Sequence, residues 1–203
     1  MKKAIPILLL SILLLSSCST QVAKRERSLA LQAEALTLLD DKEYGRAVAL
    51  FEEAVDLMPK ASEGRYNLVL ALLANGQFDE AVTLSDASFT MFPAHLEFLL
   101  AKAFAYRQKG DLDEAFALYS EILEKDKGNF PLQATLMEVA LESGYFDFAK
   151  DRALFLISVH KEEARAFGVL ATLEGEESWY GHAYSLMKGA SAEDLEQRQE
   201  QSR

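Results

Sequence analysis

The chain has 203 residues, of which 50% are hydrophobic and 26% are charged, a composition that fits a folded protein and argues against a disordered one. Its 21 Lys and Arg against 32 Asp and Glu give a net charge of −11. This balance argues against nucleic-acid binding, which relies on cations that neutralise phosphates. The single Cys excludes an intrachain disulfide and a cysteine-rich metal site, and the 4 Pro and 10 Gly are too few to favour an all-β sandwich.

The first residues predict a lipoprotein signal peptide over residues 1–17. Two lysines follow Met1, and the apolar run from Ala4 to Leu15 is too short for a ~30 Å hydrocarbon core but has the proportions of a secretory signal. The sequence Leu15-Ser16-Ser17-Cys18 resembles the bacterial lipobox, which has an apolar residue, two small residues and a Cys that receives a diacylglyceryl group. The alternatives are a plain signal peptide with a chance Cys, or a short transmembrane anchor.

The resemblance implies that Cys18 becomes the lipid-attached N-terminus, with palmitate-type acyl chains and no other cofactor. Because the rest of the chain is acidic, the lipid and not a basic patch must hold it at the membrane. Residues 18–27 form the lipidated Cys and a polar tether, of which Ser19 to Arg27 would reach about 30 Å when fully extended. Ser19 favours the periplasmic side of the outer membrane over the inner membrane, where Asp at this place retains lipoproteins.

A 34-residue period organises the rest of the chain. It relates five alanines, and a large apolar residue stands three positions before each of them: Ala47, Ala81, Ala115, Ala149 and Ala183, preceded by Tyr44, Phe78, Leu112, Phe146 and Tyr180. Gly76, Gly110 and Gly144 follow the same period, as do Pro59 and Pro93. The chain resembles a tetratricopeptide repeat (TPR) array, a helix–turn–helix repeat of this length.

The resemblance implies an all-α solenoid of about five repeats over residues 28–190, at 28–61, 62–95, 96–129, 130–163 and a degenerate 164–190. Apolar stripes with helical spacing begin at Tyr44, Phe78 and Leu112. Further along, Asn129 before Phe130-Pro131 is a candidate N-cap, and Trp179 opens a helix after the break at residues 175–178. We expect residues 191–203 to form a charged tail, either a frayed helix or disordered.

The sequence offers no catalytic constellation. His95, His160 and His182 stand alone, without the spacing of metal ligands, and there is no glycine-rich phosphate loop and no nucleophile elbow. Carboxylate pairs such as Glu52-Glu53 are most simply solvated helix faces. We therefore expect a protein that is not an enzyme and that works through its surfaces.

In tetratricopeptide proteins the concave face is formed by the first helix of each repeat. The equivalent positions here are unusually apolar for a surface, and the candidate binding residues are Tyr66, Leu70, Leu73, Leu100, Phe104 and Arg107. Such a face would suit a hydrophobic peptide or an amphipathic helix. The alternative is that neighbouring repeats or the chain's own ends bury these residues. The carboxylate-clamp branch of the family needs basic residues where this chain has Gln32, Leu36, Glu97 and Ala101, which argues against that function.

These features together predict a membrane-anchored protein–protein interaction scaffold in bacterial envelope assembly. It resembles the pilotin of type IV pili, which the strict 34-residue period favours, and the accessory lipoprotein of the β-barrel assembly machine. The expected partner is an envelope protein or peptide segment, with the membrane reached through the lipid. The alternative is a transporter-associated carrier for a hydrophobic small molecule or lipid.

Overall fold

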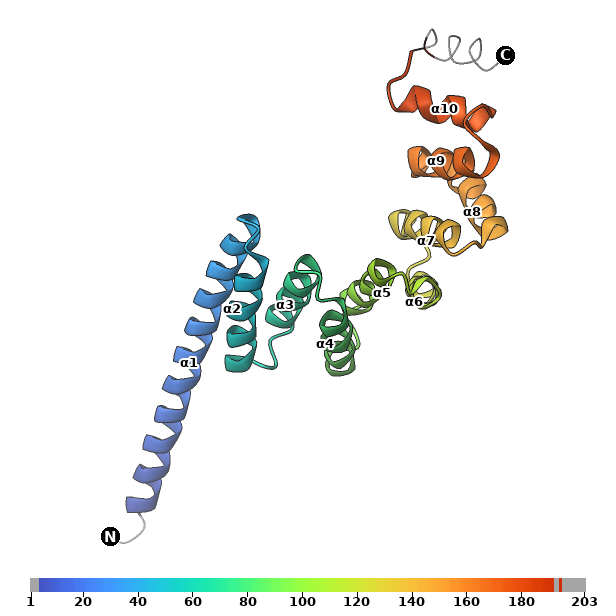
Figure 1. Ribbon diagram of the computed structural model, residues 1–203. Helices are drawn as coiled ribbons and strands as arrows, with labels where there is room; N and C mark the ends of the chain where they lie inside the picture. Colours follow the sequence, from blue (N-terminus) through green and yellow to red (C-terminus); the bar gives the residue numbers. More distant parts are fainter. Residues whose placement is uncertain (1–3, 192–193, 195–203) are drawn as a thin grey trace. The chain divides into compact units, whose positions relative to one another are not determined.

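The computed structural model describes residues 4–191 and 194, with side chains from residue 20 onward. The described part is all-α and contains ten helices (Figure 1), which are α1 (Ala4–Asp40), α2 (Tyr44–Leu57), α3 (Ser62–Ala74), α4 (Phe78–Met91), α5 (Glu97–Lys109), α6 (Leu112–Lys125), α7 (Phe130–Glu142), α8 (Phe146–Ser158), α9 (Glu163–Glu174) and α10 (Trp179–Met187). Short turns connect consecutive helices. The fold class predicted from the 34-residue period, an all-α tetratricopeptide solenoid, is thus confirmed.

The segment expected to form a polar tether has a helical conformation. Residues 19–27 are helical and continue directly into the rest of α1. The physical reason is that this segment has no Gly or Pro and contains Ala, Lys, Arg and Glu, which favour helices. The side chain of Cys18 and the tail from residue 195 lie outside the described residues. Within the described part of the chain, no helix combines the length and apolar character needed to cross a membrane.

The turns inside the repeats explain the recurring glycines. Gly76, Gly110 and Gly144 have φ angles of +74°, +85° and +81°, a left-handed conformation that costs glycine little. In the first repeat Lys42 occupies the equivalent position with φ +62°. These residues end the first helix of each pair, so that the second helix can turn back against it.

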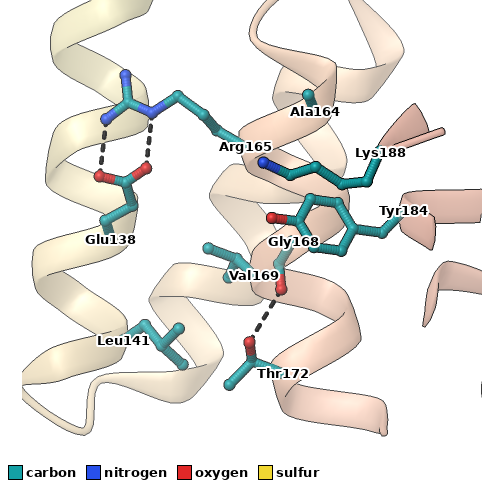
Figure 2. A pocket seen from close by; sticks show the side chains of 9 residues that line it. All are labelled: Glu138, Leu141, Ala164, Arg165, Gly168, Val169, Thr172, Tyr184 and Lys188. Carbon is teal, nitrogen blue, oxygen red and sulfur yellow. Dashed lines mark hydrogen bonds and ion pairs between the residues drawn. The ribbon is translucent and has the colours of Figure 1, made fainter. Parts of the chain in front are cut away.

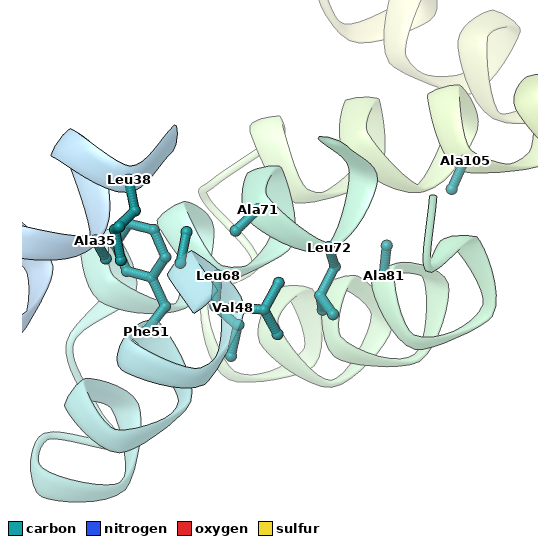
Figure 3. Close-up of a cluster of buried hydrophobic side chains, with 10 residues drawn as sticks. Ala35, Leu38, Val48, Phe51, Leu68, Ala71, Leu72, Ala81 and Ala105 are labelled. Atoms are coloured by element: carbon teal, nitrogen blue, oxygen red, sulfur yellow. The ribbon is translucent and has the colours of Figure 1, made fainter. Parts of the chain in front are cut away.

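The chain divides into two compact units, residues 1–105 and residues 106–203. In the first unit, α1 packs on α2, α2 on α3 and α3 on α4. Figure 3 shows the core at these contacts, where Phe51 lies among Ala35, Leu38 and Leu68. Phe51 and Ala35 are completely buried, and burying a large side chain of this kind stabilises the fold by about 1.5–3 kcal/mol.

The periodic alanines lie at buried positions between packed helices. Ala47, Ala81, Ala115 and Ala149 have no exposed surface. Ala183, the fifth of the series, is only half-buried, because α10 is short and no further described helix packs on it. The small residues therefore let α1 and α2, α3 and α4, and α7 and α8 approach closely.

The second unit is built in the same way. Contacts run from α6 through α7, α8 and α9 to α10, around a core that includes Met137, Leu156 and Leu170. Two helix starts carry side-chain caps. Asn129 Oδ1, the predicted cap, accepts the N–H of Leu132 at 3.0 Å, and Ser178 Oγ, which the sequence did not single out, accepts the N–H of Gly181 at 3.1 Å. The caps fix where α7 and α10 begin, at Phe130 and Trp179.

Candidate interaction surfaces

The first helices of the repeats lie next to one another in the first unit. The side-chain amide of Asn67 on α3 donates to Gln32 Oε1 on α1 over 3.4 Å. Val69 on α3 packs with Phe98 and Ala101 on α5 in one buried cluster. Helices α1, α3 and α5 therefore form a common layer, and side chains at equivalent positions of the three helices share one face of it.

That face carries exposed apolar side chains. Leu29 and Leu36 on α1 are 53% and 47% exposed, Leu70 on α3 is 40% exposed, and Phe104 on α5 is 41% exposed. Isolated exposed leucines are ordinary, but a series at equivalent positions of adjacent helices is a feature of interaction surfaces. We call this set the apolar first-helix surface; with its half-buried members it comprises Leu29, Leu36, Tyr66, Leu70, Leu73, Leu100 and Phe104.

Tyr66 and Leu73 contribute to the core as well as to this surface. The Tyr66 ring meets buried Phe98 edge-on, with centroids 5.8 Å apart and an interplanar angle of 83°. Burial, and secondarily the charge of Glu97, raises the pKa of the Tyr66 phenol, so the side chain stays neutral. Leu73 packs against the buried clusters of this unit. The exposed members Leu70 and Phe104 are therefore the cleaner probes of the surface.

Arg107, the sixth candidate binding residue, is not part of the apolar surface. It lies in the second unit, where its Nε donates to Glu142 Oε2 at 2.9 Å and its Nη2 lies 3.6 Å from Glu138 Oε2. The hydrogen bond to Glu142 raises the pKa of the guanidinium further, against the opposing effect of burial. A guanidinium held by two carboxylates of its own chain is not free to bind an anionic partner.

The first helices of the second unit carry paired charges instead of apolar groups. Arg165 on α9 forms a two-point ion pair with Glu138 on α7, with Nε to Oε1 at 2.6 Å and Nη2 to Oε2 at 2.8 Å (Figure 2). Nη2 also donates to Thr135 Oγ1, and the Glu138 hydrogen bond is the main cause of a raised pKa at Arg165. The sequence analysis missed this pair.

Beside the ion pair lies a pocket of about 310 Å³ between α7, α9 and α10. The Tyr184 ring from α10 covers Gly168, whose missing side chain leaves room for it, since a Cβ there would be 3.1 Å from the ring. Lys188 is next to Tyr184, with its ammonium 5.6 Å from the ring centroid, and Leu141 and Val169 form the apolar part of the lining.

The histidines lie where the sequence placed them, away from any shared centre. His95 Nδ1 is 2.6 Å from Glu97 Oε1 and His160 Nδ1 is 2.7 Å from Glu163 Oε1, both at helix starts. His182 lies on α10, 3.8 Å from Glu177. Among the residues that the structure describes, no three metal-ligating side chains come together.

Comparison with known proteins identifies the repeat. Two family models described as tetratricopeptide repeat match residues 38–88 and 66–130. The fold is similar to a tetratricopeptide repeat protein from Parabacteroides merdae (TM-score 0.65, 16% identity, covering 73% of this chain and 59% of that chain). It is also similar to the nearly identical TPR-like repeats of a putative kinesin light chain from Podospora anserina (TM-score 0.65, 19% identity, covering 81% and 98%).

A third similar structure is the first TPR domain of Spaghetti bound to the HSP90 peptide SRMEEVD (TM-score 0.53, 17% identity, covering 59% of this chain and 95% of that chain). No curated protein matches the sequence significantly. At these identities the structural similarity establishes the fold alone. Tetratricopeptide repeats are therefore present in this chain, and they build the all-α solenoid fold predicted from its 34-residue period.

Proposed function

We propose that this protein is a lipid-anchored scaffold of the bacterial cell envelope that binds an apolar or amphipathic segment of a partner protein. The tetratricopeptide fold itself suggests a protein–protein interaction scaffold. The observation that carries the proposal is the apolar first-helix surface, in which Leu36, Leu70 and Phe104 stand at the same repeat position, 34 residues apart, and are all exposed.

The energetics favour a partner that covers this surface. Complete burial of a large apolar side chain is worth about 1.5–3 kcal/mol, so even partial burial of the exposed leucines and Phe104 supplies a useful binding free energy. An amphipathic helix presents apolar side chains every three or four residues, so its apolar face can cover the exposed apolar side chains of adjacent first helices. The Spaghetti domain bound to an HSP90 peptide is a precedent for a peptide on this fold.

The chemistry of the partner differs from that of an acidic peptide end. The carboxylate-clamp positions hold Gln32, Leu36, Glu97 and Ala101, which provide no cation. Gln32 is buried and bonded to Ser28 and Asn67, so it too is used within the fold. Recognition by apolar contact therefore suits this surface better than recognition of a terminal carboxylate.

The anchor part of the proposal comes from the sequence Leu15-Ser16-Ser17-Cys18. A lipid on Cys18 would hold the acidic body at a membrane that otherwise repels it. We place the protein at the periplasmic side of the outer membrane, in a role like that of the pilotin of type IV pili or of the accessory lipoprotein of barrel assembly. The strict period favours the pilotin-like role.

Site-specific cross-linking in native cells tests the binding surface. A photoreactive phenylalanine analogue at Leu70 or Phe104 should give a defined adduct with one envelope protein, and the analogue at Ala49, exposed on second helix α2, should not. The variant Leu70→Ser with Phe104→Ser should lose the partner while its helical circular dichroism persists. Equal adducts from Ala49 would move the site off the first helices, and a co-purified hydrophobic small molecule without any adduct would favour a carrier.

Metabolic labelling tests the anchor separately. A fatty-acid label should enter the wild-type protein and be absent from Cys18→Ser, which should accumulate as an uncleaved precursor. The matched control is Ser17→Ala, which keeps a small residue before the Cys and should be labelled normally. Equal labelling of Cys18→Ser and wild type would contradict lipid attachment at this residue.

A further inference from the structure

A second groove lies on the opposite side of α3 from the apolar first-helix surface. Its floor is formed by Leu68 and Leu72 of α3 and Leu84 of α4, and its volume is about 460 Å³, within the range of about 300–1,000 Å³ usual for binding pockets. Leu68 and Leu72 are each two residues from Leu70, about 200° around the helix, so the groove and the first-helix surface face different ways.

Three carboxylates surround the apolar floor. Glu52 of α2 lies on one side, and Asp79 and Glu80 in the first turn of α4 lie on the other. None of the residues that line this groove is a cation. In the described part of the chain, Glu52 and Glu80 form no ion pair, whereas the neighbouring Glu53 is paired with Arg27. We call this feature the acidic groove.

In the next repeat, a lysine of the chain neutralises the carboxylate equivalent to Glu52. A shift of 34 residues takes Glu52 to Asp86 and Leu68 to Lys102, both within the first unit. There the Lys102 ammonium forms an ion pair with Asp86, so the carboxylate is neutralised within the fold. In the acidic groove Leu68 stands where the lysine would be, and the charge of Glu52 is left for a cation from outside the chain.

We propose that the acidic groove is a second docking site, for a partner protein segment in which an apolar side chain is flanked by lysine or arginine. The apolar side chain enters between α2 and α4 over the three leucines, and the flanking cations meet Glu52 on one side and Glu80 on the other. Charge complementarity of this kind selects against acidic segments and speeds association. The site is separate from the surface that carries the proposed function, so one chain engages two partners or two parts of one partner.

A photo-cross-linking assay tests the site on the full-length chain in a nonionic detergent. The probe is a blocked hexapeptide with two photoreactive leucines flanked on each side by two lysines, and its counterpart has glutamates in place of the lysines. Adducts of the lysine probe should map to α2, α3 or α4 at the groove, and the glutamate probe should give none there. Raising the salt concentration should reduce the yield, since exposed charges are screened.

Matched lysine variants test whether the charge inside the acidic groove controls the adduct yield. Thr83→Lys places a like charge in the groove and should lower the adduct yield about tenfold, because juxtaposed like charges cost several kcal/mol. Ala117→Lys, at the equivalent exposed position of α6, makes the same change in net charge and should leave the yield within about twofold. Ala87→Lys at the same groove is a second variant if Thr83→Lys loses helical circular dichroism.

Three results would overturn the proposal. Equal losses in Thr83→Lys and Ala117→Lys would mean that only the net charge attracts the probe. Adducts that map to Leu70 or Phe104 would assign the probe to the first-helix surface. Equal adducts from the glutamate probe would show that Glu52 and Glu80 do not select the charge of the bound segment. Loss of partner cross-linking at Leu70, by contrast, bears on the proposed function and leaves the acidic groove untouched.

Discussion

The two units of the molecule differ in the residues that occupy one position of the repeat. At intervals of 34 residues it holds Leu36, Leu70 and Phe104 in the first unit, then Glu138 and Thr172 in the second. The three apolar side chains are exposed, whereas Glu138 is held by Arg165 within its own unit. The same repeat position is thus exposed and apolar in one unit and is engaged in an ion pair within the fold in the other. Its surface chemistry differs between the units, while the periodic alanines Ala47, Ala81, Ala115 and Ala149 are buried in both.

The largest expected effect tests whether the apolar surface rests on the core of the first unit. Phe98→Ala removes a completely buried aromatic side chain that supports Tyr66, and should lower the free energy of unfolding by about 3–5 kcal/mol. Hydrogen exchange should speed up in α3 and α5. The control Phe146→Ala, at a side chain 55% exposed in the second unit, should cost about 0.5 kcal/mol or less. Similar costs for the two variants would mean that Phe98 is not a core residue.

A smaller loss of stability is expected when the buried alanines that both units share are enlarged. Ala81→Leu in the first unit and Ala115→Leu in the second should each overpack a closed helix crossing and cost about 1–3 kcal/mol in thermal or denaturant unfolding. Glu53→Gln on an exposed face is the control and should change stability by no more than about 0.5 kcal/mol. If Ala115→Leu melts like wild type, the assigned register fails in the second unit.

Next comes the charge pairing that distinguishes the second unit. Glu138→Ala removes the two-point ion pair of the half-buried Arg165 guanidinium, leaves it the longer carboxylate contact with Glu162 at 3.4 Å, and should cost about 1–2 kcal/mol in denaturant unfolding. Glu124→Ala breaks the exposed pair with Lys127 and should cost about 0.5 kcal/mol or less. If the two variants lose equal stability, the Glu138–Arg165 pair is no stronger than a surface contact.

The smallest effect on stability belongs to the apolar surface itself. Leu70→Ser with Phe104→Ser should change the free energy of unfolding by no more than about 1 kcal/mol, since both side chains are about 40% exposed. The same variant should lower the fluorescence of a dye that binds exposed apolar surface. A large loss of stability with unchanged dye binding would show that these side chains serve the core instead.

The repeats could be predicted from sequence because close helix crossings admit only small residues, and so the alanines repeat with the fold. Asn129 as a cap and Trp179 as a helix start were predicted from their immediate neighbours in sequence, and both are confirmed. The exposure of Leu70 and Phe104 was expected only through the family resemblance. Tyr66 and Leu73 proved to be shared with the core, since a period alone does not say how far the next repeat covers a side chain.

The charge pairs of the second unit could not be assigned so directly. Arg107 and Glu142 are 35 residues apart and Glu138 and Arg165 are 27 apart, so neither pair falls at the i,i+4 spacing of a single helix. The available signal for these pairs was the presence of opposite charges on the first helices of adjacent repeats. The position of Tyr184 over Gly168 depends on the irregular segment 175–178, where the repeat pattern breaks and offers no template.

The helical conformation of residues 19–27 has a mechanical consequence. At about 1.5 Å per residue, nine helical residues rise roughly 14 Å, about half the extended length, and they form part of one rod with the remainder of α1. A flexible tether would let a lipid-anchored body tumble over a hemisphere above the bilayer. With the lipid proposed on Cys18, a rod continuous with the first repeat would instead fix the distance and direction of the repeats from the bilayer, and would raise their effective concentration for a partner held in the same membrane.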